Sequence, residues 1–237
     1  MAIFKPDEEG RVRELLNELD RPVELLVALG PEETPLPGAR DIDFGAETQR
    51  VVEGIAALSG RVTFRVEDEP PGFERYPAVA VLPDGEDVGV RYYGLPWGYE
   101  LASLIGAVLE AGRTASSLAP ESVERLAALD RDLAIDVFVT PTCPHCPPAV
   151  LMAYRAALAS PRIRASAIEA TEFPSLADSM DVWSVPRIVI NGVPQWDGAV
   201  PERVFVDRIL AGGSGLVENH DPGPSPGVSD FRATPGG

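Results

Sequence analysis

The sequence predicts an α/β protein made of two similar halves, each a central mixed β-sheet with helices on both faces. The chain runs twice through the same order of patterns: helix, strand, helix, strand, β-hairpin, helix. The second run follows the first by about 100 residues, a period far longer than that of solenoid repeats. We therefore expect two homologous domains whose parallel strands are joined by right-handed crossovers.

In the first half, apolar residues recur at helical spacing in some segments and alternate or cluster at strand length in others. In residues 61–67, Val62, Phe64 and Val66 fall on one side, which predicts a strand with that face in a core. Pro83-Asp84-Gly85 between two apolar runs is typical of a hairpin. The expected elements in order are a helix over 7–20, a strand over 23–29, a loop over 30–45, a helix over 47–58, strands over 61–67, 77–82 and 88–93, and a helix over 101–112.

The second half repeats this series. Asn191-Gly192 between two short apolar runs is a strong signal for a two-residue hairpin turn. Tyr76-Pro77 in the first half corresponds to Val185-Pro186 in the second, each at the start of an apolar strand. The expected elements in order are a helix over 122–132, a strand over 133–139, a helix over 147–159, a strand over 162–168, a helix over 175–180, strands over 187–191 and 193–196, and a helix over 202–210.

These patterns divide the chain into a first domain over 1–115, a second domain over 116–212 and a tail over 213–237. The tail is rich in Gly and Pro, and it lacks the apolar residues that would offset the entropy of ordering it, so we expect disorder there.

The charge of the chain excludes some partners. It has 37 acidic residues against 20 basic ones, a net charge of −17 at neutral pH. Such a surface repels phosphate groups, which makes nucleic acids and anionic membranes poor partners. Residues 1–10 contain no apolar stretch of signal-peptide length, and no run of 18 apolar residues occurs, so a cytoplasmic location is expected.

The chain has two cysteines, and they form the motif Cys143-Pro144-His145-Cys146. The motif follows a predicted strand and opens a predicted helix. Backbone N–H groups and the positive end of the helix dipole then favour the thiolate of Cys143, and a protonated His145 would act in the same direction. We expect Cys143 to attack a substrate disulfide and Cys146, one turn into the helix and less exposed, to resolve the mixed disulfide.

Other interpretations of the pair remain open. The chain has only two Cys and two His, and His220 lies in the tail, so a four-ligand zinc site would need carboxylates or a second chain, and no metal is expected. An iron–sulfur cluster bridging two chains and an inert buried pair are further alternatives. Context favours redox chemistry, because a strand before the motif and a helix after it are typical of a redox-active pair.

Several further positions are candidates for the site. The strand that starts at Pro186 should lie near the cysteine loop, and the Val185-Pro186 bond is a candidate cis peptide that would leave backbone groups of Val185 free for an extended substrate. An ordinary trans proline at a strand start is the alternative. Glu169 ends the preceding strand and could accept a proton from the cysteine pair, or it could be a solvated strand end. Trp183 and Trp196 are candidates for the walls of a substrate groove.

At these residues the sequence resembles the thioredoxin superfamily, and more closely the two-domain, glutaredoxin-like protein disulfide oxidoreductases of archaea and some bacteria. A degenerate first domain followed by an active second one also resembles the N-terminal module of the bacterial alkyl hydroperoxide reductase flavoprotein. The segments that carry the resemblance are 138–147, 167–174, 184–192 and 198–202, with 94–100 in the first half.

The resemblance implies two tandem thioredoxin-like folds and thiol–disulfide exchange on protein disulfides without a bound cofactor. It also implies electrons from a thioredoxin-reductase-like flavoprotein, with a peroxiredoxin as a second possible client. The sequence differs from the family pattern in three ways. The first domain has no cysteine, Val137 stands where thioredoxin has a buried Asp, and the Gly-Gly glutathione segment of glutaredoxins is absent after Pro186. Beside disulfide exchange, the alternatives are an electron relay to a peroxiredoxin and a binding or chaperone module with silent cysteines.

Overall fold

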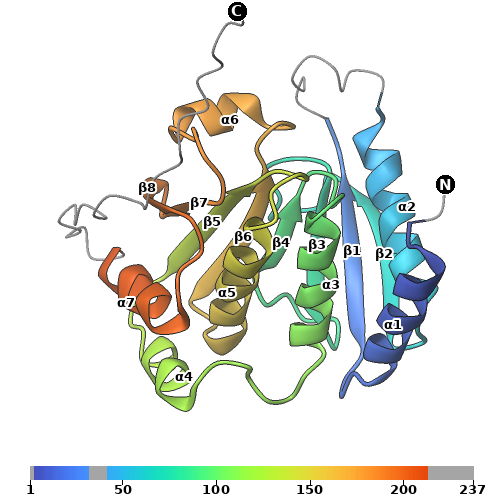
Figure 1. Cartoon of the computed structure of the whole chain (residues 1–237), viewed down its shortest axis with the longest axis horizontal. Coiled ribbons are helices and arrows are strands. Elements are labelled where there is room, and N and C mark those ends of the chain that lie inside the picture. The colour runs from blue at the N-terminus through green and yellow to red at the C-terminus, as the bar shows by residue number, and fades with distance from the viewer. Residues whose placement is uncertain (1–2, 32–41, 213–237) are drawn as a thin grey trace, which may run out of the picture.

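The computed structural model describes residues 3–31 and 42–212 (Figure 1). The described strands form one continuous sheet in the order β2-β1-β3-β4-β6-β5-β7-β8. In the first half they are β1 (Val23–Leu29), β2 (Val62–Asp68), β3 (Ala78–Pro83) and β4 (Val90–Tyr93). In the second half they are β5 (Leu133–Val139), β6 (Ile163–Glu169), β7 (Arg187–Ile190) and β8 (Val193–Asp197).

The strand pairing confirms the repeat. In the first half β1 is parallel to β2 and antiparallel to β3, and β3 is antiparallel to β4. In the second half β5 pairs with β6, and β7 with β5 and β8, in the same three orientations. The halves meet where β4 runs parallel to β6, with Tyr93 opposite Ile168. The sequence patterns did not reveal that the two half-sheets merge.

The helices lie unevenly on the two faces of the sheet. They are α1 (Pro6–Asn17), α2 (Phe44–Ala56), α3 (Glu100–Ala111), α4 (Pro120–Ala127), α5 (Cys146–Ala159), α6 (Pro174–Ser179) and α7 (Glu202–Gly212). Apolar side chains from all of them except α6 join one large core on one face. The second face has a smaller core under α6 in the second half, whereas in the first half Phe73 packs on that face.

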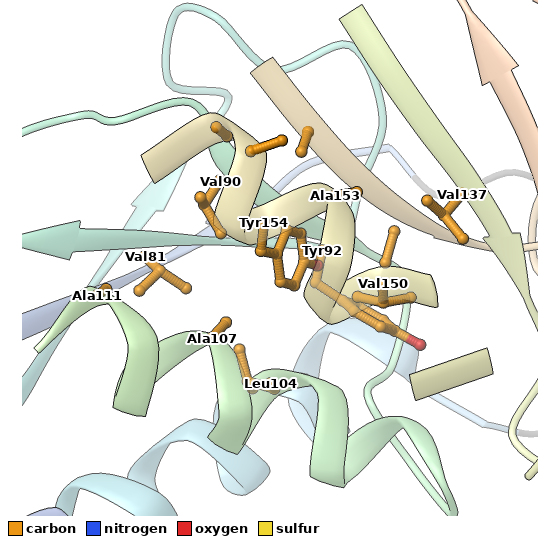
Figure 2. Packing of buried hydrophobic residues seen from close by; sticks show 14 of the residues in the cluster. Val81, Val90, Tyr92, Leu104, Ala107, Ala111, Val137, Val150, Ala153 and Tyr154 are labelled. Carbon is orange, nitrogen blue, oxygen red and sulfur yellow. The ribbon is translucent and has the colours of Figure 1, made fainter. Parts of the chain in front are cut away.

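The two halves pack through α3 and α5, which lie next to each other over the junction of β4 and β6 (Figures 1 and 2). Figure 2 shows Tyr154 of α5 among the apolar side chains of α3 and β4. The Tyr154 hydroxyl donates to the carbonyl O of Arg91 at 2.8 Å and so bridges the halves. Nearby, Arg155 lies 2.7 Å from the Glu110 carboxylate. Because these contacts are buried or partly buried, each half stabilises the other.

The sequence placed the described elements within a few residues of their positions. Both hairpin turns are confirmed, with positive φ at Asp84 and Gly85 and at Asn191 and Gly192. The expectation for residues 61–67 is wrong in part. β2 is an edge strand of the sheet, so only Val62 is buried on that face, whereas Phe64 and Val66 are 38% and 37% exposed.

Part of the expected loop over 30–45 and the whole expected tail over 213–237 lie outside the described residues. None of the described helices has the length and apolar character needed to cross a bilayer.

Candidate active site

The two thiols lie where β5 leads into α5. α5 begins at Cys146, whose backbone N–H is directed at the carbonyl O of Cys143 at 3.4 Å. Pro147 and Pro148 follow in the first turn, where a residue without an N–H leaves no helical hydrogen bond unmade. Both cysteines are free; Cys143 is half-buried, and Cys146 is fully buried. One sulfur is therefore accessible and one hidden, as the sequence predicts.

Between the thiols, Pro144 and His145 are both exposed to solvent. The strand β7 lies next to β5, and the segment before it brings Val185 to the cysteine loop. The Sγ of Cys143 lies 3.6 Å from the carbonyl O of Val185. The Val185-Pro186 bond is cis, as is Tyr76-Pro77 in the first half. The expected proximity of these elements and the expected cis bond are both confirmed.

Residues of the first half of the chain contact the backbone of the cysteine loop and hold it in position. The backbone N–H of Tyr99 donates to the carbonyl O of Pro141 at 2.9 Å, two residues before Cys143. Gly98 lies beneath the same carbonyl at φ +61°, where a Cβ would stand 2.3 Å from the Pro141 oxygen. Only glycine allows this close approach without displacing the loop. The first half thus fixes the position of a loop that belongs to the second.

Burial sets the protonation of the hidden thiol. Loss of solvent raises the pKa of Cys146 well above its ordinary value, and the contact with the sulfur of Cys143 and the charge of Glu100 raise it further. Cys146 is therefore a neutral thiol at physiological pH. Before it can act as a nucleophile, its proton must move to a nearby base.

Glu100, the first residue of α3, is the ionisable group that fits this need. Its side chain is fully buried, and neither carboxylate oxygen makes a regular hydrogen bond within the described residues. Burial raises the pKa of Glu100 to about 7, the charge of Glu169 adds to the rise, and the Ser103 hydroxyl opposes it. A carboxyl group that titrates near neutrality can both accept and release a proton there.

Glu169, the predicted acceptor, lies at the end of β6 and is fully buried rather than solvated. One of its oxygens, Oε2, accepts hydrogen bonds from the Thr171 hydroxyl and from the backbone N–H of Glu172, each at 2.7 Å. Burial raises the pKa of Glu169, and these hydrogen bonds reduce the rise. The structure thus brings a second carboxyl group into the region behind the thiols.

Sequence reasoning missed Glu100. In thioredoxin-like sequences an acid is sought on the strand before the motif, where this chain has Val137. The signal lay in residues 94–100, which carried the resemblance of the first half but received no role. A residue 43 positions before Cys143 and in the other half becomes a neighbour of the site only through the merged sheet.

A groove of about 280 Å³ lies beside Val185, whose carbonyl O is 3.6 Å from the Sγ of Cys143. It reaches Val185, and Thr171, Ala177 and Trp183 form part of its lining. Trp183 is 88% exposed and is the candidate that does border a groove beside the site. Trp196 instead packs edge-on against Phe205, with ring centroids 5.7 Å apart. Within the described residues, no three His, Cys, Asp or Glu side chains are grouped as metal ligands.

This fold and this pair of thiols are similar to those of thiol oxidoreductases of the thioredoxin superfamily. A family model described as a thioredoxin domain matches residues 133–211, the half that holds the thiols. Among solved structures, the chain is similar to a protein disulfide oxidoreductase from Aeropyrum pernix, with 29% identity and a TM-score of 0.79 over 90% of this chain and 95% of that one.

Two further relatives belong to alkyl hydroperoxide reductases. The alkyl hydroperoxide reductase protein AhpF of Escherichia coli is 28% identical over 85% of this chain and 36% of its own length. The NTD_N/C domain of the Enterococcus faecalis AhpF has a TM-score of 0.78 over 87% of this chain and 99% of that one; at 24% identity this likeness concerns the fold. The chain spans about a third of the length of the curated relatives it matches.

Proposed function

We propose that the protein exchanges thiols and disulfides with client proteins through Cys143 and Cys146. The observation that carries the proposal is the unequal exposure of the two sulfurs. The half-buried Cys143 can meet a client, whereas the fully buried Cys146 can react only with a sulfur already at the site. The thiol–disulfide chemistry of the class supports this.

In the first step, the thiolate of Cys143 attacks one sulfur of a client disulfide. A bond forms between Cys143 and that sulfur, the client S–S bond breaks, and the other client sulfur leaves as a thiolate. The backbone of Val185 beside Pro186 would hold the client chain, because its carbonyl O already lies at hydrogen-bond distance from the attacking sulfur. Pro144 and His145, exposed between the thiols, would modulate the reactivity of the pair.

In the second step, Cys146 attacks Cys143, the mixed disulfide breaks, and the second client thiolate leaves. The client has then gained two electrons, and the protein has lost two and carries a disulfide between Cys143 and Cys146. The buried Cys146 must give up its proton in this step, and Glu100 would accept it. The first half would thus provide the base for the resolving step.

The domain boundaries of 1–115 and 116–212 remain part of this proposal, as does action in the cytoplasm. A thioredoxin-reductase-like flavoprotein would return electrons to the oxidised pair, because each turnover leaves Cys143 and Cys146 as a disulfide that needs two electrons before it can act again. In that setting the first half serves as a docking and supporting domain without redox chemistry of its own.

A second candidate is an electron relay from a flavoprotein to a peroxiredoxin. It is favoured by the match to the AhpF protein of an alkyl hydroperoxide reductase, which extends over 85% of this chain. Peroxide consumption in a mixture of the protein, a disulfide-reducing flavoprotein and a peroxiredoxin would separate the two. A relay predicts faster turnover with the peroxiredoxin than with insulin.

Insulin reduction driven by dithiothreitol tests the proposed function. Cys143→Ser should abolish catalysis, whereas Cys146→Ser should form a mixed disulfide with insulin and then stop. Thr142→Ser, an exposed neighbour of the motif, is the matched control and should stay active. Full activity of Cys143→Ser would refute the role of the thiols, and client binding that survives loss of both thiols without catalysis would favour the binding module.

A further inference from the structure

Carboxyl oxygens buried behind the thiols make no regular hydrogen bond within the described residues. Both oxygens of Glu100 and Oε1 of Glu169 are buried without a partner in the described part of the chain. A buried polar atom without a partner costs about 1–3 kcal/mol, and a buried charge costs more. Because the negative charges of these two carboxylates also oppose each other, the pair favours holding at least one proton.

The two oxygens of Glu169 differ in their hydrogen bonding, and this difference determines which oxygen can receive a proton. Oε2 accepts from the Thr171 hydroxyl and from the Glu172 N–H, so it is stabilised as an acceptor. Among the described residues Oε1 has no donor, and it is the atom that can receive a proton from a neighbouring acid. The carboxyl group can therefore take a proton on one oxygen and remain hydrogen-bonded to a hydroxyl through the other.

Glu169 lies close to the start of the segment that carries Glu100, and the charges of the two carboxyl groups interact. Glu169 follows Ile168, which lies opposite Tyr93 on β4, and a Cβ on the next residue, Gly94, would come within 2.8 Å of the Cβ of Glu169. The segment that begins at Gly94 leads directly to Glu100. On the other side, Thr171 is exposed and lines the groove that reaches Val185.

The titratable groups that face the two carboxyls come from every element around them. They are Tyr92 of β4, Cys146 and Tyr154 of α5, and Glu172 after β6. None of these is basic, so no cation in this set would hold the carboxyl groups ionised. The buried Tyr92 hydroxyl, which has no partner within the described residues, lies in the same region.

We propose that Glu169 and Thr171 form the exit through which the proton of Cys146 leaves the protein. The inference rests on the proposed function. When Cys146 attacks Cys143, its S–H bond breaks and the proton goes to Glu100, while the client departs as a thiolate. Glu100 passes the proton to Oε1 of Glu169. The carboxyl group of Glu169 then turns so that the protonated oxygen faces Thr171 and donates its proton to that hydroxyl, which releases its own proton to water in the groove. Glu169 is a carboxylate again, and one proton has left the protein.

Thr171→Val tests the exit, because valine keeps the shape of threonine and removes the hydroxyl. Thr171→Ser is the matched control, since it keeps the hydroxyl. The reduced proteins are mixed with insulin and quenched with acid at successive times from pH 5.5 to 8, so that the mixed disulfide and the Cys143–Cys146 disulfide are counted separately. A Cys146→Ser background isolates the first step and reports any effect of Thr171 on client binding.

The resolving step should slow about tenfold in Thr171→Val near neutral pH and change by less than about twofold in Thr171→Ser. The tenfold effect is smaller than the loss of a direct acid or base would cause, because Thr171 acts only at the exit. The first step should be unchanged, and a small permeant buffer such as imidazole should restore part of the lost rate. Equal resolving rates in the two variants, with an active wild-type protein, would overturn the exit alone. An inactive wild-type protein would overturn the proposed function itself.

Discussion

Replacing Glu100 by Gln should make the protein more stable at alkaline pH and slower as a catalyst. The substitution keeps the shape of the side chain and removes its charge. Glu100 is fully buried with no regular hydrogen bond to either oxygen within the described residues, so its ionised form is a cost to the folded state.

The size of this cost follows from linkage. Burial raises the pKa of Glu100 from 4.5 in the unfolded chain to about 7 in the folded protein. Between these values the folded state binds the proton and the unfolded state does not, so the free energy of unfolding falls as the pH rises from 4.5 to 7. The full loss, present above pH 7, is about 3 kcal/mol. The free energy of unfolding of Glu100→Gln should not show this fall, because glutamine does not ionise.

Urea unfolding under reducing conditions at pH 5 and pH 8 measures the effect. The wild-type protein should lose about 2.5 kcal/mol more than Glu100→Gln between these two pH values, because a small part of the full loss has already occurred at pH 5. Glu124→Gln, which removes a carboxyl group from the exposed surface of α4, is the control and should follow the wild-type protein. An identical loss in wild-type protein and Glu100→Gln would refute the reasoning, because it would show that the pKa of Glu100 is the same in the folded and unfolded states.

Three other outcomes follow from the site and its support. Gly98→Ala should lower stability by at least about 1 kcal/mol, and insulin reduction with it, because the residue lies at positive φ beneath Pro141; unfolding and activity assays check this. Tyr154→Phe should lower the free energy of unfolding by about 1–3 kcal/mol by leaving the Arg91 carbonyl unpaired, measured by urea unfolding. Iodoacetamide should label Cys143 alone in the reduced native protein, as peptide mass mapping would show.

Local patterns were sufficient to predict the elements, both hairpin turns and the thiol pair. Asn191-Gly192 specifies its turn because both residues take positive φ, a property of the residues themselves. The position of Val185 beside Cys143 was also predictable, since a repeat of known strand order brings these two segments to the same end of the sheet.

The failures concern relations between segments. Alternation in residues 61–67 predicted a buried face, but burial depends on whether a strand has a neighbour on each side, and β2 has none beyond it in the sheet. Glu100 was missed for the same kind of reason. Nothing local distinguishes a glutamate that opens an exposed helix from one buried by the other half of the chain.

The ladder between β4 and β6 has a mechanical consequence. Backbone pairing extends from Val90 opposite Ala165 to Tyr93 opposite Ile168, and α3 and α5 pack across the same junction. A hinge between halves needs an interface that can open at low cost, and this one would lose a row of sheet hydrogen bonds. Cys143 is therefore held on two halves that do not move relative to each other, and a client protein must adapt its own conformation to bring its disulfide to that sulfur.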